Sequence, residues 1–228
     1  MTTAPDASGA AGGATGDASV APGTWIVALA RAIPALVLGL VITFNADHSA
    51  ALGLIGFGVY AVVVGAVLVA ASFRRLIDAA ARAPFLIQGV VTVVAGIAAL
   101  VLPSGGTPYL VWVLSAWAIV AGALELVNGV RHRRRTVAAR DWILTGALTL
   151  LLAVAVLLVP PELATAFTGP DGVERVLTAA IVVVGILGAW AIIVGVQLGI
   201  AAVSLRPERQ HPGSQGPNSE GPGGAAAS

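Results

Sequence analysis

Six long apolar runs constrain the fold of this chain more than any other feature. They lie near residues 25–44, 50–73, 85–102, 109–130, 142–159 and 178–204, and each holds 18 to 27 residues. At a rise of ~1.5 Å per residue, an α-helix of that length crosses a hydrocarbon core of ~30 Å. Backbone groups in lipid must satisfy one another, and the runs lack the alternation of barrel strands. We therefore expect six transmembrane helices.

The composition excludes a soluble globular protein. Of the 228 residues, 57% are hydrophobic and only 10% are charged, whereas soluble domains carry about 25% charged residues. So few charges do not cover a surface that faces water. The absence of cysteine excludes thiolate metal sites and cysteine nucleophiles. A net charge of +1 gives no indication of a nucleic-acid partner.

The two ends of the chain differ from the middle. Residues 1–23 lack leucine, isoleucine and aromatic residues, and residues 206–228 are rich in glycine, proline, serine and glutamine. Such segments bury too little apolar surface to offset their ordering entropy, so both are predicted to be disordered cytoplasmic tails. Residues 24–205 are predicted to form one six-helix membrane domain.

The arginines predict the orientation of the chain in the membrane. The short links at residues 45–49 and 103–108 force antiparallel helical hairpins. Ten arginines then lie on the side shared by both termini, against Arg175 alone on the other. They are Arg74, Arg75, Arg82, Arg131, Arg133, Arg134, Arg135, Arg140, Arg206 and Arg209. This bias predicts a plasma or inner membrane protein with both termini in the cytoplasm.

One sequence pattern occurs three times. Tyr60–Gly65, Trp117–Gly122 and Trp190–Gly195 share an aromatic residue, an alanine and a terminal glycine, at offsets of 57 and 73 residues. The predicted fold class is therefore all-α integral membrane, with six transmembrane helices as three parallel repeats of an antiparallel helical hairpin. The repeats cover about 25–76, 84–135 and 141–205. The third holds 16 extra residues between Pro160 and Thr178, predicted to form a solvated loop outside.

Small residues recur every seven positions within the repeats. In the second helix of each repeat they include Gly58, Gly65, Gly122, Gly129, Gly188 and Gly195. Lipid tails are as apolar as leucine, so helices in a membrane associate by close packing at small residues. A heptad spacing keeps these residues on one face. We interpret them as helix-packing positions; a lined pore is the alternative.

The segment that begins at Trp117 carries a family resemblance. It reads Trp117-Ala-Ile-Val-Ala-Gly-Ala-Leu-Glu-Leu-Val-Asn-Gly-Val-Arg131, with related segments at residues 60 and 190. It closely resembles the short membrane repeat of the HdeD-like acid-resistance proteins, over about residues 25–205. The resemblance implies a six-helix bacterial inner-membrane protein, in some members associated with acid survival. That family offers no agreed catalytic residues to carry over.

Two ionisable residues lie deep in the predicted helices. Arg31 and Glu125 each lie six residues, or ~9 Å, from the cytoplasmic end of their helices. Because buried charge in a membrane is expensive, we predict that they pair inside the bundle. Gln88, Asn128 and Gln197 fall at similar depth and complete a candidate intramembrane polar cluster. The alternatives are a substrate or proton site, and structural hydrogen bonding with snorkelling of the long side chains.

No constellation of residues points to an enzyme. The three histidines are predicted to lie in loops or tails on different sides of the membrane, so no metal cluster is expected. We expect no catalytic residues and no cofactor. The expected partners are the lipid bilayer and either a second copy or another membrane protein. Arg131, Arg133, Arg134 and Arg135 are predicted to contact anionic lipid headgroups.

The resulting prediction is a non-enzymatic membrane protein in acid or envelope stress protection that acts by packing or partner interaction. The alternative is a small-solute or proton transporter or channel that uses the Arg31 and Glu125 region.

Overall fold

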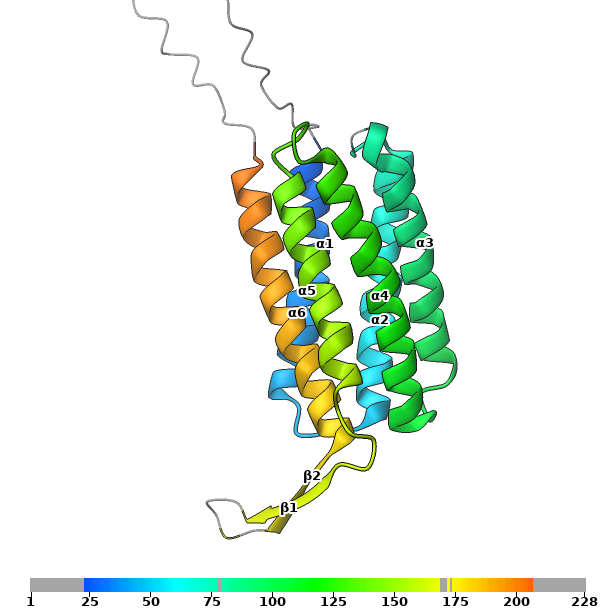
Figure 1. Ribbon diagram of the computed structural model, residues 1–228, viewed down its shortest axis with the longest axis vertical. Coiled ribbons are helices and arrows are strands. Elements are labelled where there is room, and N and C mark those ends of the chain that lie inside the picture. Colours follow the sequence, from blue (N-terminus) through cyan, green and yellow to red (C-terminus); the bar gives the residue numbers. More distant parts are fainter. Residues whose placement is uncertain (1–22, 78, 169–171, 173, 207–228) are drawn as a thin grey trace, which may run out of the picture.

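The protein is an up-and-down bundle of six α-helices with one β-hairpin. The structure, a computed structural model, describes residues 23–77, 79–168, 172 and 174–206. The helices are α1 (Thr24–Phe44), α2 (Ala50–Phe73), α3 (Ala79–Val101), α4 (Gly106–His132), α5 (Ala139–Leu157) and α6 (Ala179–Ser204). All six are long and apolar enough to cross a membrane. The chain is a multi-pass membrane protein (Figure 1).

Three helices, α3, α4 and α5, extend beyond the predicted runs. α3 begins at Ala79 and so includes Arg82, which was predicted to lie in a link. α5 begins at Ala139 and so includes Arg140, which was also predicted to lie in a link. α4 continues to His132, which is buried in its last turn, so the prediction that every histidine lies in a loop or tail is wrong. Hydropathy locates the part of a helix inside the hydrocarbon, whereas the helix itself continues into the interface. Both predicted tails lie almost wholly outside the described residues.

The extra residues of the third repeat do not form a simple loop. β1 (Ala164–Thr168) and β2 (Glu174–Thr178) pair antiparallel, with Phe167 opposite Arg175. Between them the sequence reads Gly-Pro-Asp-Gly-Val, and its first four residues are of types common in turns. The hairpin projects from one end of the bundle (Figure 1). We call this end of the bundle the hairpin end. The opposite end, where α1 begins and α6 ends, is called the terminal end.

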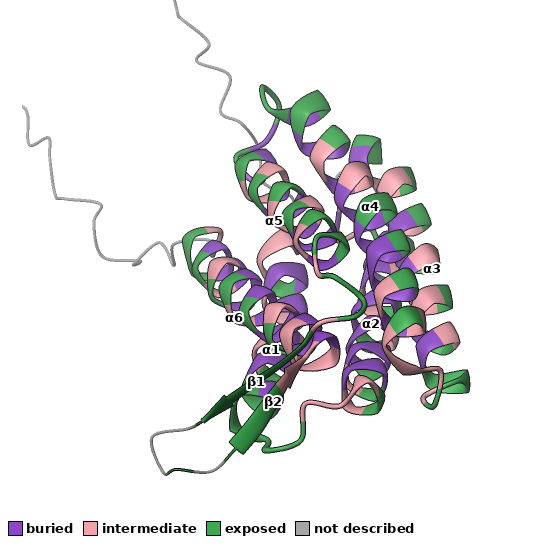
Figure 2. Ribbon diagram, turned by 60° about the horizontal axis from the view of Figure 1, so that its bottom comes forward, coloured by how far each residue is buried: buried purple, intermediate pink, exposed green. Residues whose placement is uncertain are grey.

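The closest helix pairs join neighbouring hairpins of the chain. α2 packs most extensively on α3, α4 on α5, and α1 on α6, whereas the two helices of each hairpin touch less. α1 and α6 thereby close the bundle, and the Arg206 guanidinium lies 4.9 Å from the Trp25 ring centroid. α2, α4 and α6 also contact one another across the centre. These three helices therefore form the inner core. Figure 2 shows that each helix has both buried and exposed sides.

Glycines set the distance between the closest helices. A Cβ added to Gly65 in α2 would lie 2.7 Å from the carbonyl oxygen of Gly89 in α3, and one on Gly122 in α4 would lie 3.0 Å from that of Gly146 in α5. The other four predicted packing glycines also face a neighbouring helix. Gly58 faces Gly96, Gly129 faces Ala139, Gly188 faces Ile42 and Gly195 faces Leu36. All six lie at the three closest interfaces, where a backbone atom or a side chain of the partner helix occupies the space that a Cβ would need.

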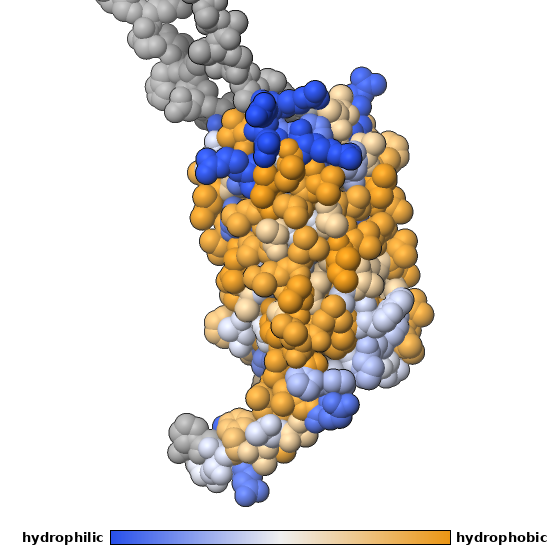
Figure 3. Space-filling model, in the orientation of Figure 1, coloured by the Kyte–Doolittle hydropathy of each residue, from blue (hydrophilic) through white to orange (hydrophobic). Residues whose placement is uncertain are grey.

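The outer surface matches a bilayer. Large apolar side chains are exposed along every helix, among them Val37, Ile55 and Ile200. In the space-filling view an uninterrupted hydrophobic band covers the helices, and hydrophilic residues gather at the terminal end (Figure 3). Hydrocarbon, and not water, is the solvent that fits this surface.

The close interfaces predict opposite effects for two glycine-to-alanine changes. Gly146→Ala would place a methyl group 2.5 Å from the Leu126 nitrogen, whereas a Cβ at Gly199 meets nothing within 4 Å. We expect Gly146→Ala to lower the free energy of unfolding by ~1–3 kcal/mol. Gly199→Ala should be neutral or raise it by up to ~1 kcal/mol, because alanine favours helix. Reversible unfolding in mixed micelles measures both; equal effects would contradict this account of the packing.

Candidate functional site

A buried ion pair occupies the bundle interior. Arg31 of α1 donates from Nη1 to Glu125 Oε1 at 2.8 Å and from Nη2 to Oε2 at 2.9 Å. Gln88 of α3 donates from Nε2 to the same Oε2 at 2.8 Å. Arg31, Gln88 and Glu125 are 6%, 4% and 2% exposed. Side chains of α1 and α3 therefore meet at one carboxylate of α4.

The geometry of this site favours a fixed pair of charges. Both carboxylate oxygens of Glu125 accept hydrogen bonds, and the paired donation from Arg31 is the planar, two-point arrangement that suits guanidinium and carboxylate. Pairing of the charges and hydrogen bonds to both carboxylate oxygens offset much of the cost of removing two charges from water. The buried Arg31 Nε has no hydrogen-bond partner among the described residues. Sequence positions in register with Glu125 hold Leu68 and Leu198, so only one repeat contributes an acid.

The remaining members of the predicted cluster lie elsewhere. Gln197 donates to the Asp141 carbonyl at 3.1 Å, and its Oε1 lies 3.3 Å from the Thr145 hydroxyl. It therefore joins α6 to α5. The amide of Asn128 is buried and has no hydrogen-bond partner among the described residues, although its backbone carbonyl lies 2.8 Å from His132 Nδ1. The site thus unites Arg31, Gln88 and Glu125 and leaves out Asn128 and Gln197.

An aromatic layer lies next to the ion pair, toward the hairpin end. Tyr60, Trp117 and Trp190, one from each inner helix, meet edge to face with ring centroids 5.6–6.3 Å apart. Trp117 precedes Glu125 by eight residues on α4, or ~12 Å along the helix. These aromatic residues open the three related sequence segments. Their shared register was the signal that they would meet, but the sequence analysis interpreted them only as a repeat.

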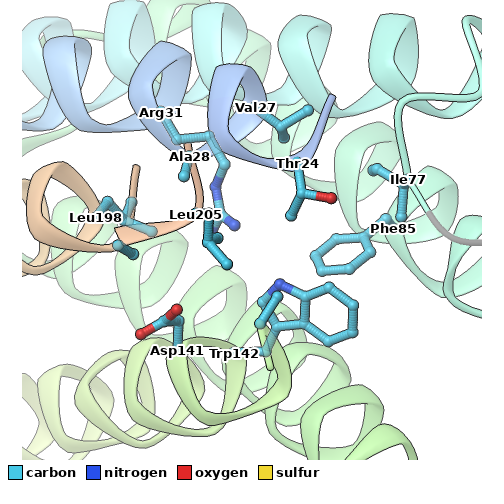
Figure 4. Close-up of a pocket in the computed structure, with 12 residues that line it drawn as sticks. Thr24, Val27, Ala28, Arg31, Ile77, Phe85, Asp141, Trp142, Leu198 and Leu205 are labelled. Carbon is cyan, nitrogen blue, oxygen red and sulfur yellow. The ribbon is translucent and has the colours of Figure 1, made fainter. Parts of the chain in front are cut away.

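Two cavities flank the Arg31 side chain. A small inner cavity lies between the ion pair and the aromatic layer, and its walls include Thr92, Thr145 and Thr149. The second cavity is also small, about 30 Å³, and lies at the terminal end between Thr24 and Leu205. Figure 4 shows Arg31 extending into this second cavity, with Asp141, Trp142 and Phe85 around it. Arg31 lines both cavities and separates one from the other.

The arginine cluster after α4 lies at the terminal end. Arg131, Arg133, Arg134 and Arg135 are all exposed. Figure 3 shows hydrophilic residues gathered at this end, above the apolar band. Cationic side chains at that level suit contact with anionic headgroups. In the described part of the chain, no three metal-ligating side chains gather.

Comparison with known proteins gives one finding. A family model described as a short repeat of unknown function, DUF308, matches the sequence. The match covers residues 87–158. This segment runs from α3 through α4 to the end of α5 and contains both Gln88 and Glu125. No curated protein and no solved structure gave a significant match to the chain.

The ion pair predicts a non-additive pair of substitutions. Glu125→Leu introduces the leucine that the other two repeats have at the related positions, 68 and 198. This change leaves Arg31 buried without a counter-charge. Arg31→Met leaves the carboxylate unpaired. Each single change should cost ~3–5 kcal/mol of unfolding free energy, and the double variant should recover most of that loss. Reversible unfolding of all four proteins measures the coupling; additive single losses would contradict the pairing.

The aromatic layer predicts unequal effects for two matched changes. Trp117 Nε1 donates to Thr92 Oγ1 at 3.1 Å, while the buried Trp190 Nε1 has no partner among the described residues. Both Trp→Phe changes remove similar ring area, but only Trp117→Phe also removes a hydrogen bond. Its loss of unfolding free energy should therefore be larger by ~1 kcal/mol. Equal losses would show that the Trp117 hydrogen bond adds nothing to stability.

Proposed function

We propose that this is a non-enzymatic, non-conducting bacterial inner-membrane protein of the HdeD-like type. In this proposal both termini face the cytoplasm, and the protein protects the envelope under acid or related stress. It acts as a packed body in the bilayer that contacts a second copy or another membrane protein. The observation that carries the proposal is the closed centre of the bundle, where a buried, hydrogen-bonded ion pair and an aromatic layer follow one another.

The closed centre argues against a permanent water path. Glu125 has both oxygens engaged, and beside it three aromatic rings fill the space between α2, α4 and α6. Farther toward the hairpin end, Leu54, Leu110 and Leu114 are fully buried in the same core. Ions and polar solutes need hydrated or coordinated positions along a pore, which these side chains do not supply.

The β-hairpin supports a role in partner contact. β1 is exposed throughout its length, and β2 is exposed at its first three residues. A two-stranded sheet has two open edges whose backbone groups can pair with another strand. Phe167 and Val176 are about half exposed and add apolar surface to this projection. The hairpin therefore offers an exposed surface to a partner outside the bilayer.

A second candidate function is transport of protons or small solutes through the Arg31 and Glu125 region. The observation that favours it is the cavity at the terminal end, which reaches Arg31 and lies next to the inner cavity. An intramembrane carboxylate with access from one side is a common component of proton pathways. Transport would require the aromatic layer to separate, since it closes the other side.

Proton flux into proteoliposomes distinguishes the two functions. Under an imposed pH gradient, wild-type protein and Glu125→Gln should give the same flux as protein-free vesicles, because the packed core passes no protons. Folded, monodisperse Glu125→Gln is the matched control, since its amide keeps the shape of the side chain and removes the carboxylate. Folding is checked because this variant also leaves Arg31 without a counter-charge. A wild-type flux that Glu125→Gln abolishes would overturn the proposal in favour of transport.

The same variants test the protective role in cells. Cells that lack the gene should survive an acid shock less well, and both wild-type protein and Glu125→Gln should restore survival. Unchanged survival on deletion of the gene would remove acid protection from the proposal. Rescue by wild-type protein but not by a stably expressed Glu125→Gln would instead link protection to the carboxylate.

A further inference from the structure

A large groove lies apart from the ion pair, between α4 and α5 at the hairpin end. It has a volume of about 500 Å³, within the ~300–1,000 Å³ typical of small-molecule sites. Its α4 wall runs from Thr107 to Ile119, and its other wall includes Leu157, Val159 and Ala179. The groove therefore lies in the lipid-facing surface of the bundle.

The groove exists because small side chains replace glycines at one interface. In α2 and α3, Gly58 lies against Leu100 and the Gly96 carbonyl. The positions 57 residues later are Ser115, Leu157 and Ala153. Side chains on both helices prevent the closest approach, and Leu157 is 57% exposed where Leu100 is 38% exposed. Because Gly122 and Gly146 bring the helices together farther along, the gap is confined to the hairpin end.

The dimensions of the groove match one leaflet of a bilayer. From Thr107 to Ile119 the α4 wall extends twelve residues, or ~18 Å. One leaflet contributes half of a ~30 Å hydrocarbon core, or ~15 Å. The groove begins beside the first residues of α4, at the membrane surface, and ends near the middle of the helix. Its length and starting level are those of a single lipid tail.

The groove is polar at the membrane surface and apolar toward the bilayer centre, as the headgroup and acyl chain of a lipid are. The surface end holds the Thr107 hydroxyl and the indole of Trp112, which is 69% exposed. Tryptophan favours the headgroup level, where its N–H can donate to ester or phosphate oxygens. The deep end is formed by Ala116 and Ile119. A second groove between α5 and α6 has almost entirely apolar walls from Leu148 to Ile193 and lacks such a surface end.

We propose that this groove binds one acyl chain of a phospholipid from the leaflet at the hairpin end. The headgroup and glycerol lie at Thr107 and Trp112, and the chain lies along Ala116 and Ile119 against Leu157. The bound acyl chain occupies the gap between α4 and α5. At the glycine-lined interfaces the helices approach closely and no such gap forms. This site is independent of the ion pair, so it stands whether or not the protein conducts protons.

Photo-crosslinking in a defined bilayer tests the site. Full-length protein is reconstituted in phosphatidylethanolamine and phosphatidylglycerol vesicles that contain a phosphatidylethanolamine with a diazirine on its acyl chain. After illumination, peptide mass spectrometry should find several-fold more label on residues 107–119 and 157–159 than on the α5–α6 groove. Label spread evenly over the lipid-facing residues would overturn the proposal.

Two variants provide the controls. Ala116→Trp fills the groove and should reduce label in residues 107–119 at least threefold, whereas Ala66→Trp makes the same change on an exposed position of α2 and should leave it unchanged. Ser115→Gly with Ala153→Gly closes the gap by closer packing and should reduce label without added bulk. Helical circular dichroism and a monodisperse elution profile establish folding. Undiminished label in both folded groove variants would overturn the assignment.

Discussion

Close approach of helix backbones is the constraint on which this bundle depends. Lipid tails compete with side chains for apolar contact, so burial of leucine or valine between helices gains little in a membrane. Gly65 against Gly89 and Gly122 against Gly146 allow backbone contact instead. These two interfaces join α2 to α3 and α4 to α5, and a third close interface joins α6 to α1. Together the three interfaces close the bundle and hold the inner helices α2, α4 and α6 around one centre.

The interior that results has two layers of different chemistry. Arg31, Gln88 and Glu125 form a polar layer whose charges are paired and hydrogen-bonded. Tyr60, Trp117 and Trp190 form the aromatic layer beside it. The polar layer fixes which helices meet, because an unpaired charge there would be very costly. The aromatic layer fills the centre with large rings. Together they favour a static core over a conducting one.

Much of this arrangement follows from sequence, but through different kinds of signal. Hydropathy located six helices because a ~30 Å apolar layer requires long apolar segments. Equal depth matched Arg31 to Glu125, which form two hydrogen bonds in the structure. The depth of a residue in the membrane does not give its angular position around the bundle axis. The sequence analysis therefore assigned Gln197 and Asn128 to the same site, because their depths are similar. The β-hairpin was missed because its two short strands lack a strong apolar alternation.

The sequence by itself determined the solvent of this protein, the number of its helices and their alternating directions, since these depend on local composition and link length. Only the tertiary structure decided which helices pack closely, that the aromatic residues of three segments meet at the centre, and that Ser115 and Ala153 leave a groove where glycines would close it. The physical reason is that lipid provides no directional force between helices. Partner choice is therefore set by the matching of small-residue surfaces and buried polar groups in three dimensions.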